Sequence, residues 1–400
     1  MLPPVYLDHA ATTPLDPRVF DAMLPALDDR FGNPSSSHAS GRAARSLVDR
    51  AREETASLLG AASEEIVFTG SGTEANNLAL YGVFGPSPRG HLVTSAIEHP
   101  SVLEVCRDLE RRGVAVTYLA PDETGIVRSD ALATALRPDT RLVSIMAANN
   151  VVGTIQPIAA LGQLAHGAGA LFHTDAVQAA GKLPFSLRDQ PIDLLSMSAH
   201  KLHGPKGVGA LFVRRGVALT PIVRGGGQER GLRSGTENTA AIIGLGAAAR
   251  IARDEGAEEC ARQVGLRDRI IDEILASVQC AYVIGHRHVR LPGHVCMAFS
   301  GLETDSIRLQ LLLDEEGIHV STGSACSAHQ GDKPSYVLAA MGFDPIRARG
   351  ALRITLGRFT TVADVVRLLD VLPRAILRLA PTTSGAGHYK ASPKTAERNR

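Results

Sequence analysis

The sequence predicts an α/β protein in which a large domain contains a doubly wound, mostly parallel sheet and a smaller α+β domain is attached to it. Short apolar runs of β-type composition alternate with longer segments whose apolar residues repeat at helical spacing. After an alanine-rich helical stretch at residues 239–261, this alternation changes to a few strands with helices between them. A chain of 400 residues is also longer than one domain usually is.

The predicted strands of the large domain are short and apolar throughout, which is typical of parallel strands buried on both faces. Between them lie helical segments such as residues 46–59, where apolar side chains repeat every three to four positions. We therefore expect parallel strands at residues 65–69, 91–95, 114–119, 141–147, 170–174, 193–198 and 209–213.

The expected boundaries place the large domain at residues 15–258. Residues 1–14 and 259–379 would form the small domain, with strands near 295–299 and 353–356. The last segment, 380–400, is polar and rich in small residues, and we expect it to be disordered.

Composition argues for small-molecule chemistry. The net charge is only +1, so there is no electrostatic signature of a nucleic-acid partner or of an anionic membrane surface. The N-terminal sequence lacks a basic segment followed by an apolar run, and no stretch is long and apolar enough to span a bilayer, so we expect a cytoplasmic enzyme.

The cysteines are five in number, scattered, and without a CxxC pair, which favours neither a disulfide framework nor a zinc site. At least one thiol stays free. Four of them, Cys106, Cys260, Cys280 and Cys296, are expected to be small buried hydrophobic residues, and Cys326 is treated below.

A glycine-containing loop follows the first strand of the large domain, at residues 70–77 (GSGTEANN). Its glycines let backbone N–H groups approach an anion at the start of a helix, which predicts a bound phosphate. The same residues fit a loose G-x-G-x-x-A dinucleotide fingerprint, and a plain strand-to-helix turn is a third interpretation.

Only one of the six lysines, Lys201, directly follows a buried-looking strand. A lysine that forms a Schiff base needs such a rigid and partly desolvated position, with hydroxyl and imidazole donors nearby. Asp175 ends another predicted strand and could pair with a protonated pyridine nitrogen, although by itself it also fits a helix N-cap. Lys201, Asp175 and the glycine loop together favour pyridoxal 5′-phosphate as the cofactor.

With these residues in place, the chain resembles the class V aminotransferase family of fold-type I pyridoxal-phosphate enzymes, and within it the cysteine desulfurases. The matching stretches are residues 6–14 (YLDHAATTP), 32–36 (GNPSS), 149–150 (NN) and 350–361 (GALRITLGRFTT). The resemblance covers nearly everything except the C-terminal tail. It departs at Val151, where the family usually has an acid, and at Arg224, where it commonly has histidine.

The resemblance implies a role for each site residue. Lys201 would bind the cofactor aldehyde, and His99 would stack on the ring and move protons. Asn150 and Arg353 would bind the substrate carboxylate, and Thr236 would reach the phosphate of a partner subunit, so that the enzyme is a homodimer. The remaining contacts to the cofactor would come from Gly72, Thr73, Ser198 and His200 at the phosphate, Gln178 at the ring hydroxyl and Asp175 at the ring nitrogen.

The stretch that indicates sulfur chemistry is residues 321–335 (STGSACSAHQGDKPS), where small residues surround Cys326. The family's Gly-Ser-Ala-Cys motif implies that Cys326 takes sulfur from L-cysteine as a persulfide and that L-alanine is released. The length of the segment between Cys326 and Pro334 favours the mobile-loop type of the family over the tethered one. Acceptors would be an iron–sulfur scaffold or a tRNA-thiolation enzyme.

No metal site is expected. Cys326 is the one candidate for contact with an iron–sulfur cluster, and His286, His288 and His294 are interpreted as part of a solvated turn. Three competing functions stay open: a selenocysteine lyase or another class V pyridoxal-phosphate lyase, a dinucleotide-binding dehydrogenase, and a sulfur-relay protein without catalysis.

Overall fold

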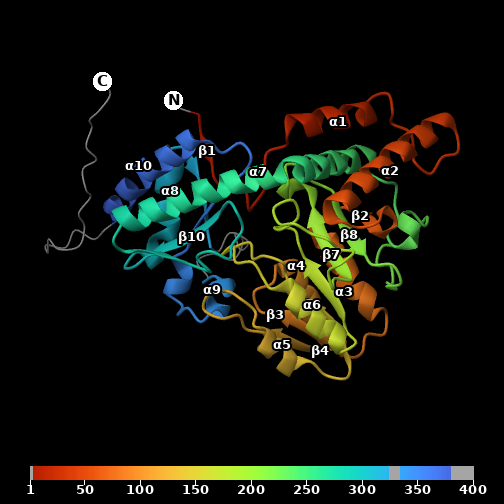
Figure 1. Cartoon of the computed structure of the whole chain (residues 1–400), viewed down its shortest axis with the longest axis horizontal. Coiled ribbons are helices and arrows are strands. Elements are labelled where there is room, and N and C mark those ends of the chain that lie inside the picture. Colours follow the sequence, from red (N-terminus) through yellow and green to blue (C-terminus); the bar gives the residue numbers. More distant parts are fainter. Residues whose placement is uncertain (1–2, 324–333, 380–400) are drawn as a thin grey trace.

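A computed structural model describes residues 3–323 and 334–379 of the chain (Figure 1). Its main feature is a seven-stranded sheet with the order β2-β8-β7-β6-β5-β3-β4. Each strand predicted for the large domain is present within three residues of its expected bounds. The strands are β2 (Ile66–Thr69), β3 (His91–Ser95), β4 (Ala115–Leu119), β5 (Thr140–Ser144), β6 (Leu171–Asp175), β7 (Leu194–Ser198) and β8 (Gly209–Val213).

One strand of this sheet contradicts the expectation that all are parallel. β8 is antiparallel to both of its neighbours, β7 and β2, while β7, β6, β5, β3 and β4 pair in parallel. The length of the connection explains the difference. A parallel crossover needs a dozen residues or more, and only residues 199–208 join β7 to β8. The sheet is therefore mostly parallel, as predicted.

Helices cover both faces of the sheet because successive strand residues point to opposite sides. Ile66 and Phe68 of β2 belong to one apolar core, and Val67 between them belongs to a second one. The first core includes residues of α2, α5 and α6, and the second includes residues of α3 and α4. The helices of this part are α1 (Pro17–Leu27), α2 (Ala39–Leu59), α3 (Gly72–Phe84), α4 (Pro100–Arg111), α5 (Ser129–Ala135) and α6 (Ile158–Gly167).

The long helix α7 (Thr239–Ser277) connects the two ends of the molecule, as Figure 1 shows. The predicted end at residue 261 is wrong, because Leu266, Ile270 and Ile274 continue the apolar face of the helix into a further core. Its N-terminal half packs with the seven-stranded sheet, and its C-terminal half packs with a smaller sheet.

The smaller sheet has the order β12-β13-β10-β9 and is antiparallel throughout. Its strands are β9 (Ala281–Val283), β10 (His294–Phe299), β12 (Ser321–Thr322) and β13 (Leu352–Thr355), beside a two-stranded pair of β1 (Val5–Tyr6) and β11 (Ile318–His319). The helices here are α8 (Ser306–Glu315), α9 (Tyr336–Ala340) and α10 (Val362–Leu379). The domain boundary near residue 258 stays a prediction, and the predicted tail 380–400 lies outside the described residues.

Candidate active site

A cavity of about 320 Å³ lies where the carboxyl ends of β6 and β7 meet segments from the rest of the chain. In open α/β sheets this is the edge at which ligands bind. Ten of the residues predicted for the site line it: Gly72, Thr73, His99, Asn150, Asp175, Gln178, Ser198, His200, Lys201 and Arg353. Thr236 does not, and Cys326 lies outside the described residues.

The anion cradle is the N-terminus of α3. Ser71 caps this helix by accepting a hydrogen bond from the backbone N–H of Glu74 at 3.1 Å. The N–H groups of Gly72 and Thr73 belong to the first turn, where the helix itself supplies no acceptor and the helix dipole favours an anion. A Cβ atom at Gly72 would lie 2.6 Å from Cγ2 of Val177, so close packing requires glycine there.

Lys201 ends a short 3₁₀ turn (Ala199–Lys201) that follows β7 directly. β7 is buried along its whole length, so the backbone before the turn is rigid. The Nζ atom donates hydrogen bonds to the carbonyl oxygens of Ala10 and Ala11, both at 2.6 Å. The N-terminal segment therefore holds the amine in the cavity, a contact that no motif in the sequence indicated.

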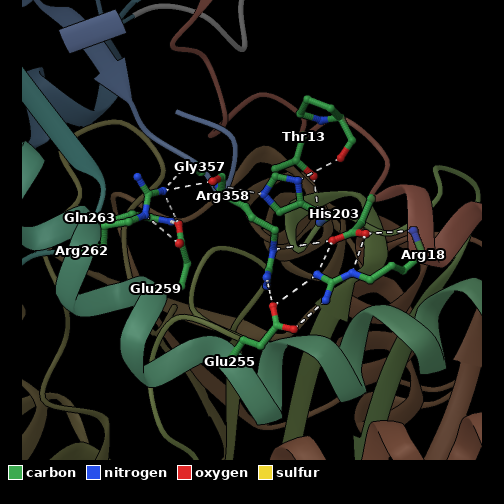
Figure 2. A network of polar contacts seen from close by, with 11 residues as sticks. Thr13, Arg18, His203, Glu255, Glu259, Arg262, Gln263, Gly357 and Arg358 are labelled. Carbon is green, nitrogen blue, oxygen red and sulfur yellow. Dashed lines mark hydrogen bonds and ion pairs between the residues drawn. The ribbon is translucent and has the colours of Figure 1, made fainter. Parts of the chain in front are cut away.

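Hydrogen bonds from the same segment fix the turn itself. Thr13 Oγ1 donates to the carbonyl of His200 at 3.0 Å and accepts from the backbone N–H of His203 at 2.8 Å. His203 has a positive φ of 63°, and its ring contacts the carbonyl of Pro14 at 2.9 Å. Figure 2 shows Thr13 and His203 side by side, next to Arg358.

An ion cluster extends this network to α7. Arg18 contacts Asp16 at 2.8 Å and Glu255 of α7 at 2.6 Å, and Arg358 also pairs with Glu255 (Figure 2). Arg262 of α7 donates to the carbonyl of Gly357 at 3.1 Å. The N-terminal segment and the loop after β13 are thus joined to the same helix, which positions both of them beside the cavity.

Asp175 is 5% exposed, and both of its carboxylate oxygens are engaged. Oδ1 accepts from the backbone N–H of Val177 at 2.9 Å, and Oδ2 accepts from Nδ2 of Asn76 at 2.8 Å. No helix begins after Asp175, so the N-cap interpretation is wrong. The carboxylate is held by fixed donors at the end of its strand.

His99 and His200 bring imidazole groups to the cavity. His99 is the N-cap of α4, and its Nδ1 accepts from the backbone N–H of Ser101 at 3.1 Å. His200 contacts Oγ1 of Thr12 through Nδ1 at 3.1 Å. Burial, together with the nearby positive charge of Lys201, lowers the pKa of His200 to about 4, so this ring is neutral.

Arg353 of β13 is only 1% exposed. Its Nη1 donates to the carbonyl of Asn150 at 3.0 Å, and its Nη2 pairs with Asp8 at 2.7 Å. The buried Nε has no acceptor among the described residues. A guanidinium anchored on one edge with a donor left over is suited to bind a carboxylate.

Gln178, like Arg353, has a buried polar atom without a hydrogen-bond partner in the described part of the chain. Its Nε2 donates to the carbonyl of Ala10 at 2.9 Å, while its Oε1 is buried and has no partner in the described part of the chain. A buried acceptor of this kind indicates a hydroxyl or N–H group of a bound molecule.

Sequence reasoning missed Asn76 and Ser101, which also line the cavity. Asn76 lies one helical turn after Gly72 and faces the same side of α3. This i, i+4 spacing from the cradle was the available signal. For Ser101 the signal was its place two residues after His99, in the first turn of the helix that His99 caps.

Thr236 lies elsewhere, exposed, in a second hollow with Glu229 and Arg233. The segment that carries it is anchored by one buried and one partly buried ion pair. Glu229 accepts two hydrogen bonds from Arg52, both at 2.7 Å, and Arg233 pairs with Glu74 of α3 at 2.8 Å. Thr236 therefore sits on a fixed surface, outside the cavity of its own chain.

The expectation of a solvated turn is wrong for His294. This residue begins β10, is 2% exposed, and donates from Nε2 to the carbonyl of Val151 at 2.9 Å. Val151 is itself part of an apolar core. Among residues 3–323 and 334–379, no three His, Cys, Asp or Glu side chains form a group that could hold a metal ion.

The four other cysteines lie outside the cavity. Cys106 and Cys296 are buried as predicted, but Cys260 and Cys280 are only partly buried, which corrects that expectation. Burial raises the pKa of Cys296 to about 12 and that of Cys106 further, so neither thiol ionises near neutral pH. The role of Cys326 as the sulfur nucleophile stays a prediction, because this residue lies outside the described residues.

Comparison with known proteins places this fold and site in a family. The family model described as aminotransferase class-V matches residues 5–368, and the chain belongs to that family, which in general uses pyridoxal phosphate. Within it, the chain belongs to the cysteine desulfurases. "Cysteine desulfurase IscS" of Dictyoglomus turgidum is 47% identical over 98% of this chain and 99% of its own.

Solved structures agree with this assignment. A "NifS-like protein" is 38% identical with a TM-score of 0.87, over 94% of this chain and 100% of its own. The structure described as "SspA in complex with cysteine" is also 38% identical, with a TM-score of 0.78, over 89% of this chain and 99% of its own. No helix in the described part of the chain is long and apolar enough to cross a membrane.

Proposed function

We propose that this chain is a pyridoxal-phosphate-dependent cysteine desulfurase that converts L-cysteine to L-alanine and carries the sulfur as a persulfide on Cys326. The observation that carries the proposal is the meeting of Lys201, Asp175 and Arg353 in one cavity, which also contains a helix N-terminus suited to a phosphate. A dinucleotide site needs the helix N-terminus but gives no role to a lysine amine beside it.

The residues present fit the cofactor. The buried, unpaired Oε1 of Gln178 supplies an acceptor for a ring hydroxyl, and Asp175 presents a carboxylate to a ring nitrogen. The phosphate contacts would come from Gly72, Thr73, Ser198 and His200, and Lys201 would bind the aldehyde. When bound, pyridoxal phosphate supplies an electron sink for the substrate carbons.

The other polar groups of the cavity bind and orient the substrate. Arg353 and Asn150 hold its carboxylate, and the N-terminal segment keeps Lys201 within reach. The thiolate of Cys326 then forms an S–S bond to the substrate sulfur while the C–S bond breaks. The electron pair of that bond stays with carbon, which takes up a proton and becomes the methyl group of alanine.

The test is to measure alanine and sulfide formed from L-cysteine and a reductant by the purified enzyme, beside Lys201→Ala and Cys326→Ala. Equal amounts of both products are expected, with a fall of at least about 10³-fold in each variant. Cys260→Ala is the matched control, because this thiol is partly buried outside the cavity, and it should keep full activity.

The same preparation separates the competing functions. A faster reaction with selenocysteine than with cysteine would favour a selenocysteine lyase. A colourless protein that takes up NAD would overturn the proposal in favour of a dinucleotide site. A yellow protein without turnover on either amino acid would favour a sulfur-relay protein.

We also propose a homodimer in which Thr236 reaches the phosphate of the partner subunit. In support, Thr236 is exposed, lies outside the cavity of its own chain, and is carried by a segment anchored to α3 through Arg233. Thr236→Val should weaken cofactor binding without changing the dimeric mass in light scattering. Sulfur-acceptor proteins as partners and a cytoplasmic location stay predictions.

A further inference from the structure

His99 is connected to Asp175 by an uninterrupted chain of hydrogen bonds. Asn76 Nδ2 lies 2.8 Å from Oδ2 of Asp175 and 2.8 Å from Oγ of Ser101. Ser101 Oγ lies 2.8 Å from Nδ1 of His99. Asn76 is 1% exposed and Ser101 is 8% exposed, so water does not compete for these contacts.

The donors and acceptors in this chain can be assigned by elimination. The carboxylate of Asp175 only accepts, so the amide of Asn76 must present its N–H₂ group to it and has its second hydrogen for Ser101. At the other end, Nδ1 of His99 accepts from the backbone N–H of Ser101 and therefore carries no hydrogen. The single hydrogen between Ser101 Oγ and Nδ1 must then belong to the hydroxyl.

We infer that Ser101 and Asn76 are positioning residues that fix neutral His99 in the tautomer with its hydrogen on Nε2. The backbone N–H and the hydroxyl of Ser101 both donate to the lone pair of Nδ1. Nδ1 therefore faces α4, the helix that His99 caps. The opposite edge of the ring is left with an N–H. Toward an acceptor in the cavity, neutral His99 can then only donate.

The tautomer follows from these contacts alone, whereas its meaning for catalysis rests on the function proposed above. Since the basic lone pair of the neutral ring, on Nδ1, is occupied by the two donors of Ser101, neutral His99 binds an oxygen, nitrogen or sulfur acceptor as a hydrogen-bond donor and does not remove a proton from a ligand. A base has to come from another group of the cavity. A neutral imidazole that acts as a donor at a helix N-terminus is a known catalytic arrangement.

The first experiment reads the tautomer directly by ¹⁵N NMR of histidine-labelled enzyme, without and with cofactor. At about pH 8.5, two units above the ordinary imidazole value, we expect a pyrrole-type Nε2 and a pyridine-type Nδ1 for His99. The spectrum of His99→Gln identifies the signals among those of 14 histidines. A pyrrole-type Nδ1 in the wild-type enzyme would overturn the inference, whatever the activity.

The second experiment removes the hydroxyl. In Ser101→Ala the Nδ1 signal should move toward that of a nitrogen with fewer hydrogen bonds, and kcat should fall about five-fold, the effect of one neutral hydrogen bond. Ser101→Thr keeps a hydroxyl and should restore both values. An unchanged Nδ1 signal in Ser101→Ala would refute the role of Ser101.

The two readouts separate this inference from the proposed function. If the enzyme does not act on cysteine but the NMR result holds, the proposed function fails and the assignment of His99 stands. Thermal unfolding of both variants provides the control for stability, because a loss of fold would lower kcat without a specific change at Nδ1.

Discussion

At the scale of single residues, Arg353 illustrates how a side chain predicted from a motif acquires its geometry from distant partners. Its guanidinium is oriented by Asp8 at 2.7 Å and by the carbonyl of Asn150 at 3.0 Å. These partners lie 345 and 203 positions away in the sequence. The motif indicated a carboxylate-binding arginine, but only the fold shows that one edge of it is already occupied.

This geometry makes Arg353→Lys a demanding test of the substrate site. A lysine has no planar fork, so it cannot keep both anchors and also bind the substrate carboxylate. We expect the KM for L-cysteine to rise about a hundredfold with a smaller change in kcat, as the loss of two charge-assisted hydrogen bonds implies. Steady-state kinetics measures both constants.

Arg347→Lys is the matched control. Arg347 lies in the same stretch of chain but is exposed and stacks on the rings of Tyr282 and Phe343 outside the cavity. Its KM should equal that of the wild type. An unaltered KM in Arg353→Lys would instead show that the substrate carboxylate is bound elsewhere.

At the scale of elements, the anion cradle depends on a strand that comes 137 residues later. A Cβ atom at Gly209, the first residue of β8, would lie 2.6 Å from the carbonyl carbon of Ser71 and 2.8 Å from the nitrogen of Gly72. Both are backbone atoms that cannot move aside without displacing the start of α3. The sequence places glycines in the cradle but does not reveal this one.

We therefore expect Gly209→Ala to weaken cofactor binding by at least about tenfold, in line with the cost of overpacking. Titration of the apoenzyme, followed by absorbance, measures the affinity. Gly265→Ala is the control, because nothing lies within 4 Å of a Cβ atom there and α7 should gain up to about 1 kcal/mol. Equal affinities in the two variants would argue against a close contact at Gly209.

At the scale of the whole molecule, several buried or partly buried histidines make the fold sensitive to acid. Burial lowers the pKa of His9 and His173 to about 3, and that of His200 and His203 to about 4. In the unfolded chain each would titrate near 6.5. Between these values the unfolded state binds more protons than the folded state.

Above about pH 6.5 these histidines should therefore not change the free energy of unfolding. As the pH falls from about 6.5 toward 4, they should lower it. Each histidine contributes up to about 1.4 kcal/mol per pH unit in that window. Urea unfolding at a series of pH values measures the slope. The slope reports how many more protons the unfolded state binds than the folded state. His173→Gln should reduce this number by about one, whereas His288→Gln, at an exposed histidine, should leave it unchanged. Equal slopes in the two variants would contradict a lowered pKa of His173.

The sequence by itself determined the strands of the large sheet, the mostly parallel α/β class, and ten residues that meet in the cavity. It could do so because apolar periodicity and strand-end polar residues are local properties, and parallel strands bring their carboxyl ends to one edge.

Only the tertiary structure decided the direction of β8, the burial of His294, the anchors of Arg353 and Lys201, and the links of Asn76 and Ser101 to Asp175 and His99. These features depend on contacts between segments far apart in the chain. Such contacts form because buried donors and acceptors must find partners wherever the packing of helices and sheets places them, which no local pattern specifies.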